Sequence, residues 1–130
     1  MYIKIPYTFS AFTLVTKVLL SNTTLTNFSS SLPNSLAYFY IYSTNAPGSQ
    51  NFEFTPTTNL ALLPSFRELL INNSDMSGFT YNFSGSSSFR TLQLYGNNSL
   101  TDLNITVPTG PIFRDLYIIN NTSLPTFTVT

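Results

Sequence analysis

The sequence predicts a mostly-β solenoid, and three observations support this prediction. One phrase recurs along the chain at Phe66, Phe89 and Phe113, at close to constant spacing. Short runs of alternating apolar and other residues close most of its copies, and a period of two is typical of strands. No segment shows a convincing period of 3.6 residues, and the abundant Thr, Asn and Ser are poor helix formers. We therefore expect no substantial helix.

The composition limits the classes of function. The chain has 130 residues, enough for one domain, with 42% hydrophobic and only 8% charged residues. Its net charge of zero argues against a nucleic-acid partner held by a basic surface. It has no Cys and no His, which removes a disulfide framework, a thiolate metal site and the commonest general base. We expect no cofactor and no bound metal.

The first residues predict a strand over 1–11, because Ile3, Ile5, Tyr7 and Phe9 alternate with other residues. No apolar run approaches the roughly 18 residues of a spanning helix, so we expect no membrane span. The segment also fits a signal peptide poorly. Either the protein reaches a surface by another route, for example on a virus particle, or the chain is a mature piece or fragment.

The recurring phrase has the spacing Phe-Arg-x-Leu-x-(Ile/Leu)-x-x-(Asn/Ser) in its three strong copies. Two weaker copies, at 15–23 and 36–44, precede them. Aligning the copies on Leu20, Ile41, Ile71, Leu94 and Ile118 gives intervals of 21, 30, 23 and 24 residues. We predict a single repeat domain over 1–130, with the N-terminal strand followed by repeats at about 12–32, 33–62, 63–85, 86–109 and 110–130.

This pattern resembles the leucine-rich repeat, L-x-x-L-x-L-x-x-N-x-L, whose period is 20–29 residues. The resemblance covers about residues 12–130, although the first two copies lack the leading Phe-Arg. In the family, the Asn position forms an internal ladder, which Asn97 and Asn121 fit directly, with Thr23, Thr44 and Ser74 as substitutes. The resemblance implies binding or scaffolding rather than catalysis, which is an analogy from fold.

A second alternating run predicts a second short strand in most turns of the solenoid. These runs are Phe52-x-Phe54, Phe79-x-Tyr81-x-Phe83, Leu103-x-Ile105-x-Val107 and Phe127-x-Val129. An ordinary β-sandwich is the alternative fold, but it does not explain the recurring Phe-Arg.

Equivalent positions of a solenoid stack into columns along its axis. One outward column is predicted to hold Leu19, Tyr40, Leu70, Gln93 and Tyr117, and the next to hold Ser21, Tyr42, Asn72, Tyr95 and Ile119. Apolar side chains that align on an exposed face are typical of an interface, whereas single surface aromatics are ordinary. We expect an assembly or ligand face made by Leu19, Tyr40, Tyr42, Leu70, Tyr95, Tyr117 and Ile119.

A third column contains Arg67, Arg90 and Arg114, beside Glu68 and Asp115. We interpret it as a charge ladder in which arginine and carboxylate neutralise each other between repeats, a kind of contact that contributes little to stability. A stripe that binds an acidic ligand or a glycan is the alternative.

Several Asn residues lie in the Asn-x-Ser/Thr pattern of N-glycosylation. Asn97 and Asn121 are expected to point inward, so Asn82 and Asn104 on the second strands are the better acceptors. Such sites agree with an extracellular or otherwise surface-exposed protein.

No paired carboxylates with a raised pKa, nucleophile with a base, or phosphate loop is apparent, so we expect no enzyme. Both ends of the pattern look uncapped, and an uncapped solenoid exposes its core and strand edges. The sequence favours a structural protein that self-assembles, as a homo-oligomer or larger assembly, into a fibre, coat or appendage on a cell or virion surface. The alternative is a recognition module whose partner is a protein or a glycan.

Overall fold

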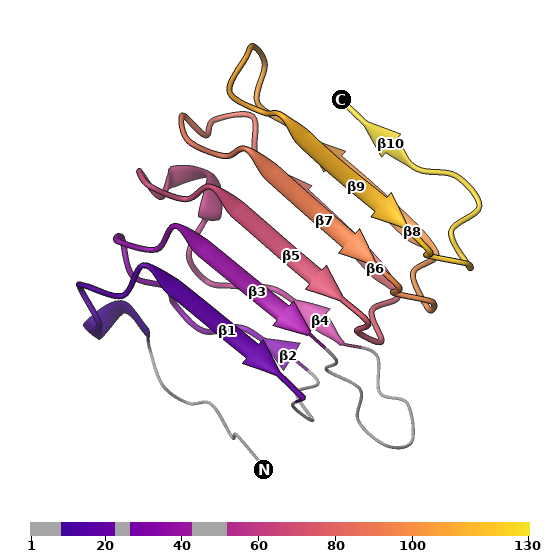
Figure 1. The fold of residues 1–130 in the computed structure, drawn as a ribbon, viewed down its shortest axis with the longest axis horizontal. Helices are drawn as coiled ribbons and strands as arrows, with labels where there is room; N and C mark the ends of the chain where they lie inside the picture. The colour runs from indigo at the N-terminus through magenta and orange to yellow at the C-terminus, as the bar shows by residue number, and fades with distance from the viewer. Residues whose placement is uncertain (1–8, 23–26, 43–51) are drawn as a thin grey trace.

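The computed structural model describes residues 9–22, 27–42 and 52–130, and they form a parallel β-solenoid of about four turns (Figure 1). Each turn contributes one strand to a five-stranded main sheet, in the order of the chain. These strands are β1 (Lys17–Ser21), β3 (Tyr38–Tyr42), β5 (Glu68–Asn72), β7 (Thr91–Tyr95) and β9 (Asp115–Ile119). The mostly-β solenoid predicted from the sequence is confirmed.

A second layer of strands lies behind the main sheet (Figure 1). It consists of β2 (Asn27–Phe28) paired with β4 (Glu53–Phe54), and of β6 (Gly78–Asn82), β8 (Asp102–Thr106) and β10 (Thr128–Val129) in one sheet. The strands β4, β6, β8 and β10 lie on the second alternating runs of the sequence, whereas β2 lies on none of them. The prediction of two short strands in most turns is therefore confirmed.

The repeats stack in the register that the sequence predicts. Leu20, Ile41, Ile71, Leu94 and Ile118 occupy one column of the main sheet. Each paired strand is parallel to the one before it, although the intervals between repeats differ in length. The segments between the strands absorb this difference, so the alternation of inward and outward side chains is kept.

The core lies between the two layers and is built from inward-pointing columns. Leu69, Ile71, Leu92 and Leu94 are completely buried. The Phe of the recurring phrase forms a further column, in which the rings of Phe66 and Phe89 stack almost parallel with centroids 5.8 Å apart. Phe113 continues this stack at 5.7 Å from Phe89. The phrase therefore places its Phe in the core and its Arg outside.

The turns after β1, β5, β7 and β9 repeat one backbone conformation. The residue that follows the strand has a positive φ at Asn22, Asn73, Gly96 and Asn120, with values of 51°, 50°, 67° and 56°. Gly and Asn are the residues that adopt this left-handed conformation most readily. The polar ladder position comes next in the chain. In the pair Asn120-Asn121, the first residue therefore adopts the left-handed conformation and the second holds the ladder.

The expected ladder of Asn side chains is present inside the solenoid. Asn97 accepts a hydrogen bond from the Ser74 N–H at 3.0 Å and donates one to the Ile71 carbonyl at 2.8 Å. Asn121 repeats both bonds one turn later, with the Asn97 N–H and the Leu94 carbonyl, each at 2.9 Å. Thr23 and Thr44, the two expected substitutes, lie outside the described residues.

The N-terminal strand predicted over 1–11 is wrong in the part that the structure describes. Phe9–Ala11 is a single 3₁₀ turn, and residues 1–8 lie outside the described residues. The turn is fixed by the Phe9 N–H, which donates to the Ser31 carbonyl at 3.0 Å. Phe9 also stacks on Phe28 with ring centroids 6.2 Å apart, so it packs against the core instead of pairing in a sheet.

Candidate interaction surfaces

The outer face of the main sheet carries the two columns predicted from the sequence. The strand pairing aligns Leu19 with Tyr40, Leu70, Gln93 and Tyr117, and Ser21 with Tyr42, Asn72, Tyr95 and Ile119. The seven side chains of the expected assembly face therefore lie on one surface. Their exposure is not uniform, and the difference separates the middle of the sheet from its edges.

The middle of this face has a row of tyrosines along β3. The rings of Tyr38 and Tyr40 meet edge to face at 6.2 Å, and those of Tyr40 and Tyr42 do so at 6.3 Å. The Lys17 Nζ lies 5.3 Å from the Tyr38 ring centroid and 5.1 Å from that of Tyr40, a distance suited to cation–π attraction. These contacts hold the rings in a fixed row.

The polar atoms in the middle of the face bond to one another. The Tyr40 hydroxyl donates to the Glu68 Oε2 at 2.6 Å, and the Gln93 amide donates to the Asn72 Oδ1 at 3.2 Å. Burial of the phenol and its hydrogen bond to the Glu68 carboxylate raise the pKa of Tyr40 above its ordinary value. Asn72 is only 7% exposed, although its column faces outward. Tyr40, Tyr42 and Leu70 are half-buried.

Large exposed apolar side chains gather at the two ends of the described solenoid. Eight of the nine lie in the first turn or the last two turns, and Leu62 is the ninth. The eight are Phe12, Leu14, Leu19, Tyr95, Tyr117, Ile119, Phe127 and Val129, with exposures from 36% to 90%. Of the expected face, only Leu19, Tyr95, Tyr117 and Ile119 belong to this exposed set. Phe12, Leu14 and Leu62 were not predicted, because no repeated spacing marks them.

The last turn also leaves inward-pointing residues partly uncovered. Phe113, Leu116 and Ile118 pack against the core but are only partly buried. Their equivalents one turn earlier, Phe89, Leu92 and Leu94, are completely buried. At β9, apolar side chains are therefore exposed or only partly buried on both the outer and the inner face of the sheet.

The arginine column has the predicted alignment but not the predicted pairing. Among the residues that the structure describes, Arg67, Arg90 and Arg114 form no ion pair with a carboxylate. Glu68 accepts from Tyr40, and Asp115 accepts from the Thr91 hydroxyl at 3.3 Å. The repeated contact at this position is made by the backbone: the Arg90 N–H donates to the Arg67 carbonyl at 2.8 Å, and the Arg114 N–H to the Arg90 carbonyl at 2.9 Å.

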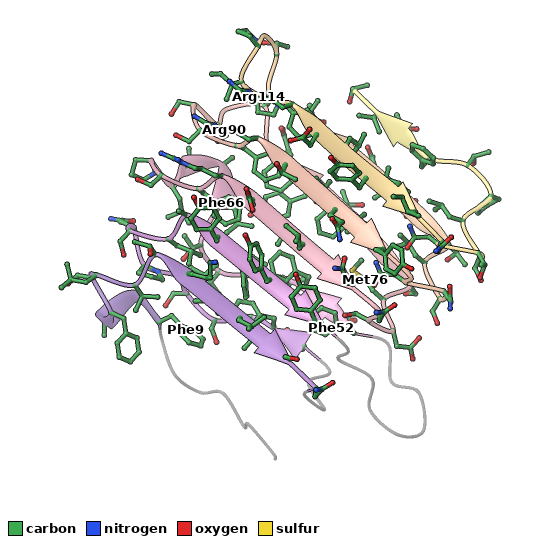
Figure 2. The ribbon with its side chains drawn as sticks, viewed as in Figure 1. Phe9, Phe52, Phe66, Met76, Arg90 and Arg114 are labelled. Carbon is green, nitrogen blue, oxygen red and sulfur yellow. The ribbon has the colours of Figure 1, made fainter. Side chains whose placement is uncertain are left out.

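Figure 2 shows Arg90 and Arg114 where the chain enters β7 and β9. Both side chains are exposed, as is that of Arg67. The carboxylates Glu68 and Asp115 share one column with Thr91, and each follows its arginine directly in the sequence. The interpretation as direct arginine–carboxylate pairs is not supported by this geometry.

The second layer presents the two expected glycosylation sites. Asn82 and Asn104 are both exposed on β6 and β8, and the Asn82 Oδ1 accepts a hydrogen bond from the Ser84 N–H at 2.9 Å. Asn97, by contrast, is completely buried and holds the ladder. Modification of Asn82 and Asn104 remains a prediction.

A shallow, open hollow of about 340 Å³ lies beside β6. Tyr81 lines it, and its hydroxyl oxygen accepts a hydrogen bond from the Leu60 N–H at 2.9 Å. Burial raises the pKa of Tyr81, against the lowering effect of that bond. The other lining residues are Pro56, Thr57, Asn59, Thr80 and Asn82. None of these groups is charged at neutral pH.

Within the described ranges, no three His, Cys, Asp or Glu side chains are grouped closely enough to hold a metal ion. The same ranges contain no helix with the length and apolar character needed to cross a membrane.

The chain was compared with protein-family models, with curated proteins and with solved structures, and none of them matches it. The protein is accordingly described by its fold, a parallel β-solenoid, without assignment to a family.

Proposed function

We propose that this protein is a non-enzymatic structural protein that self-assembles through the ends of its solenoid. The observation that carries the proposal is the distribution of exposed apolar side chains, which gather in the first turn and the last two turns. Exposed apolar side chains that gather in one region are typical of protein contacts. The assembly would be a fibre, a coat or an appendage on an extracellular or virion surface.

The partly covered last turn supports an end contact. Burying an apolar side chain stabilises a structure by about 1.5–3 kcal/mol relative to leaving it in water. Leu116 and Ile118 realise only part of this gain, and Tyr117 and Ile119 are 43% and 44% exposed. A neighbour that covers β9 would recover the remainder.

The charge of the protein also favours association. Only 8% of its residues are charged and the net charge is zero, so copies repel each other weakly. The exposed Asn82 and Asn104 agree with a surface location, because glycosylation occurs on secreted chains.

A recognition module similar to leucine-rich-repeat proteins is the second candidate function. The tyrosine row of β3, flanked by Lys17 and Glu68, favours it, because Tyr is enriched in protein contact surfaces. Such a module would bind a protein or a glycan on the outer face of the main sheet. The internal bonds of Tyr40 and Gln93 make the middle of this face less available than the ends.

Light scattering and negative-stain microscopy separate the two candidates. We expect filaments or large oligomers of the native protein, and their loss in the double variant Tyr117→Glu, Ile119→Glu, which changes the exposed end. The matched control, Tyr40→Glu with Tyr42→Glu, changes the middle of the same face and should leave assembly intact. A monodisperse particle of 14.5 kDa would contradict self-assembly. Loss of assembly in the control alone would place the contact on the sheet face.

A further inference from the structure

Among the residues that the structure describes, β1 and β9 are the edge strands of the main sheet. One series of backbone hydrogen bonds runs across the sheet from the first turn toward β9. The carbonyls of Thr16, Ala37, Arg67 and Arg90 each accept two N–H groups from the following turn, at 2.8–3.2 Å. The residue at the same position in the last turn is Arg114, and no described residue donates to its carbonyl. The Arg114 carbonyl could therefore accept the two backbone N–H groups that a further turn would donate.

A second series of backbone bonds stops at the same edge. The N–H groups of Asn22, Asn73 and Gly96 donate to the carbonyl at the end of the next main strand, at 2.8–3.0 Å. Asn120 is the equivalent residue of the last turn, and no described residue accepts its N–H. An edge with unpaired donors and acceptors in this order is a template for one more parallel strand.

The strand β1 offers the groups that this edge lacks. Thr16 and Lys17 are the first-turn equivalents of Ala37 and Tyr38, whose N–H groups donate to the Thr16 carbonyl. In a second copy placed after β9, the N–H groups of Thr16 and Lys17 would therefore face the Arg114 carbonyl. Ser21 occupies the same column as Tyr42, Tyr95 and Ile119. The carbonyls of these three residues accept the N–H groups of the second series. The Ser21 carbonyl would consequently accept the Asn120 N–H.

The charges of the two edges are complementary in this register. Lys17, Tyr38, Glu68, Thr91 and Asp115 form one column across the sheet. Adding β1 of a second copy after β9 places Lys17 of that copy beside Asp115. Opposite charges on neighbouring strands stabilise a pairing, and like charges oppose it. The same register places the exposed Leu19 beside the exposed Tyr117.

We infer that β9 of one copy pairs in parallel with β1 of a second copy, with Lys17 of the second copy beside Asp115 of the first. This inference rests on the proposed function, which it narrows to one contact. Because the two surfaces are different, the contact is head-to-tail. It continues the stacking of parallel strands along the solenoid axis, so its product is a filament. The second layer contributes less at this junction, since Phe9 stacks on Phe28 there.

Charge exchange between the two residues tests the inference. Lys17→Asp and Asp115→Lys each place like charges at the junction, and each alone should raise the critical concentration for filaments about tenfold or more. An equimolar mixture of these two variants restores opposite charges at every junction of an alternating filament. The double variant restores them within one chain. We expect the mixture and the double variant to assemble at close to the wild-type concentration, as measured by light scattering.

The controls make the same changes of charge away from the junction. Arg67→Asp and Asp102→Lys change exposed residues of inner turns and should assemble as the wild type does. Circular dichroism checks that every variant folds. If a charge exchange prevents folding, Lys17→Gln and Asp115→Asn remove each charge and should both raise the critical concentration.

The possible results separate this inference from the proposed function. Filaments that form equally well in all variants would overturn the Lys17–Asp115 junction and leave self-assembly standing. Failure of the mixture and of the double variant, when each single change blocks assembly, would also overturn the junction. A wild-type protein that stays monomeric at every concentration would overturn both.

Discussion

The turn that begins at Phe89 and the turn that begins at Phe113 share a sequence phrase and a register, yet they differ in burial. Leu92 and Leu94 of the first are completely buried, whereas Leu116 and Ile118 of the second are only partly buried. The first has a turn on each side, and the second has a described turn on one side only. In a solenoid, the same residues therefore contribute different amounts to stability, depending on their neighbours.

The largest expected effect comes from a charge placed in the core of each turn. Leu94→Asp would bury an unpaired carboxylate and should lower the free energy of unfolding by about 4 kcal/mol or more, which is enough to unfold many domains. Ile118→Asp leaves its carboxylate closer to water, so we expect a clearly smaller loss. Urea unfolding followed by circular dichroism measures both. Equal losses would mean that the two turns are equally covered.

A smaller effect is expected for the polar ladder. Asn97→Ala leaves the Ser74 N–H and the Ile71 carbonyl without their buried partner, at a cost of about 1–3 kcal/mol. Asn121→Ala removes the same two kinds of bond at a half-exposed site, where water replaces them in part. We expect Asn97→Ala to lower the urea midpoint more. The reverse order would show that the last turn is better protected than its exposure indicates.

The smallest effect concerns the left-handed residue after each strand. Gly96 has a φ of 67°, and a Cβ there would come within 2.2 Å of the Asn73 Oδ1. Gly96→Ala should therefore lower the free energy of unfolding by about 1–2 kcal/mol. Gly85→Ala is the control, because its Cβ would meet no atom within 4 Å, and its effect should stay within about 0.5 kcal/mol. Equal melting temperatures for the two variants would contradict this account.

Much of the fold could be predicted from the sequence, because the repeat spacing and the alternation of apolar residues indicate the same strands. The spacing from Phe66 to Phe89 and Phe113 sets the period, and the alternation around Leu92 and Leu94 sets which side chains point inward. The ladder residues Asn97 and Asn121 could be located as well, because an Asn in the turn after a strand can satisfy backbone groups that the turn exposes.

Other features depend on neighbours that the local sequence does not reveal. Phe9 continues an alternating run that is typical of a strand, but its ring packs on Phe28 and the backbone turns. Asn72 lies in an outward column and is still buried, since Gln93 of the next strand bonds to it. The carboxylates Glu68 and Asp115 bond to hydroxyl groups, although an Arg precedes each one in the sequence.

The sequence predicts uncapped ends, but it does not predict which residues of the outward columns are most exposed. Tyr40 and Tyr117 share a column, and the sequence places both in the expected assembly face. In the structure Tyr40 is held by Glu68 and Lys17, whereas Tyr117 is 43% exposed. Position along the solenoid, rather than residue type, separates the two.

The central claim is that the uncovered side of β9 is the contact through which the protein assembles. Segment-resolved hydrogen exchange of the native protein, below and above the concentration at which it assembles, tests this claim directly. We predict that exchange in 115–120 slows by about tenfold or more on assembly, while exchange in β5 and β7 hardly changes. Assembly that leaves exchange in 115–120 unchanged would contradict the claim.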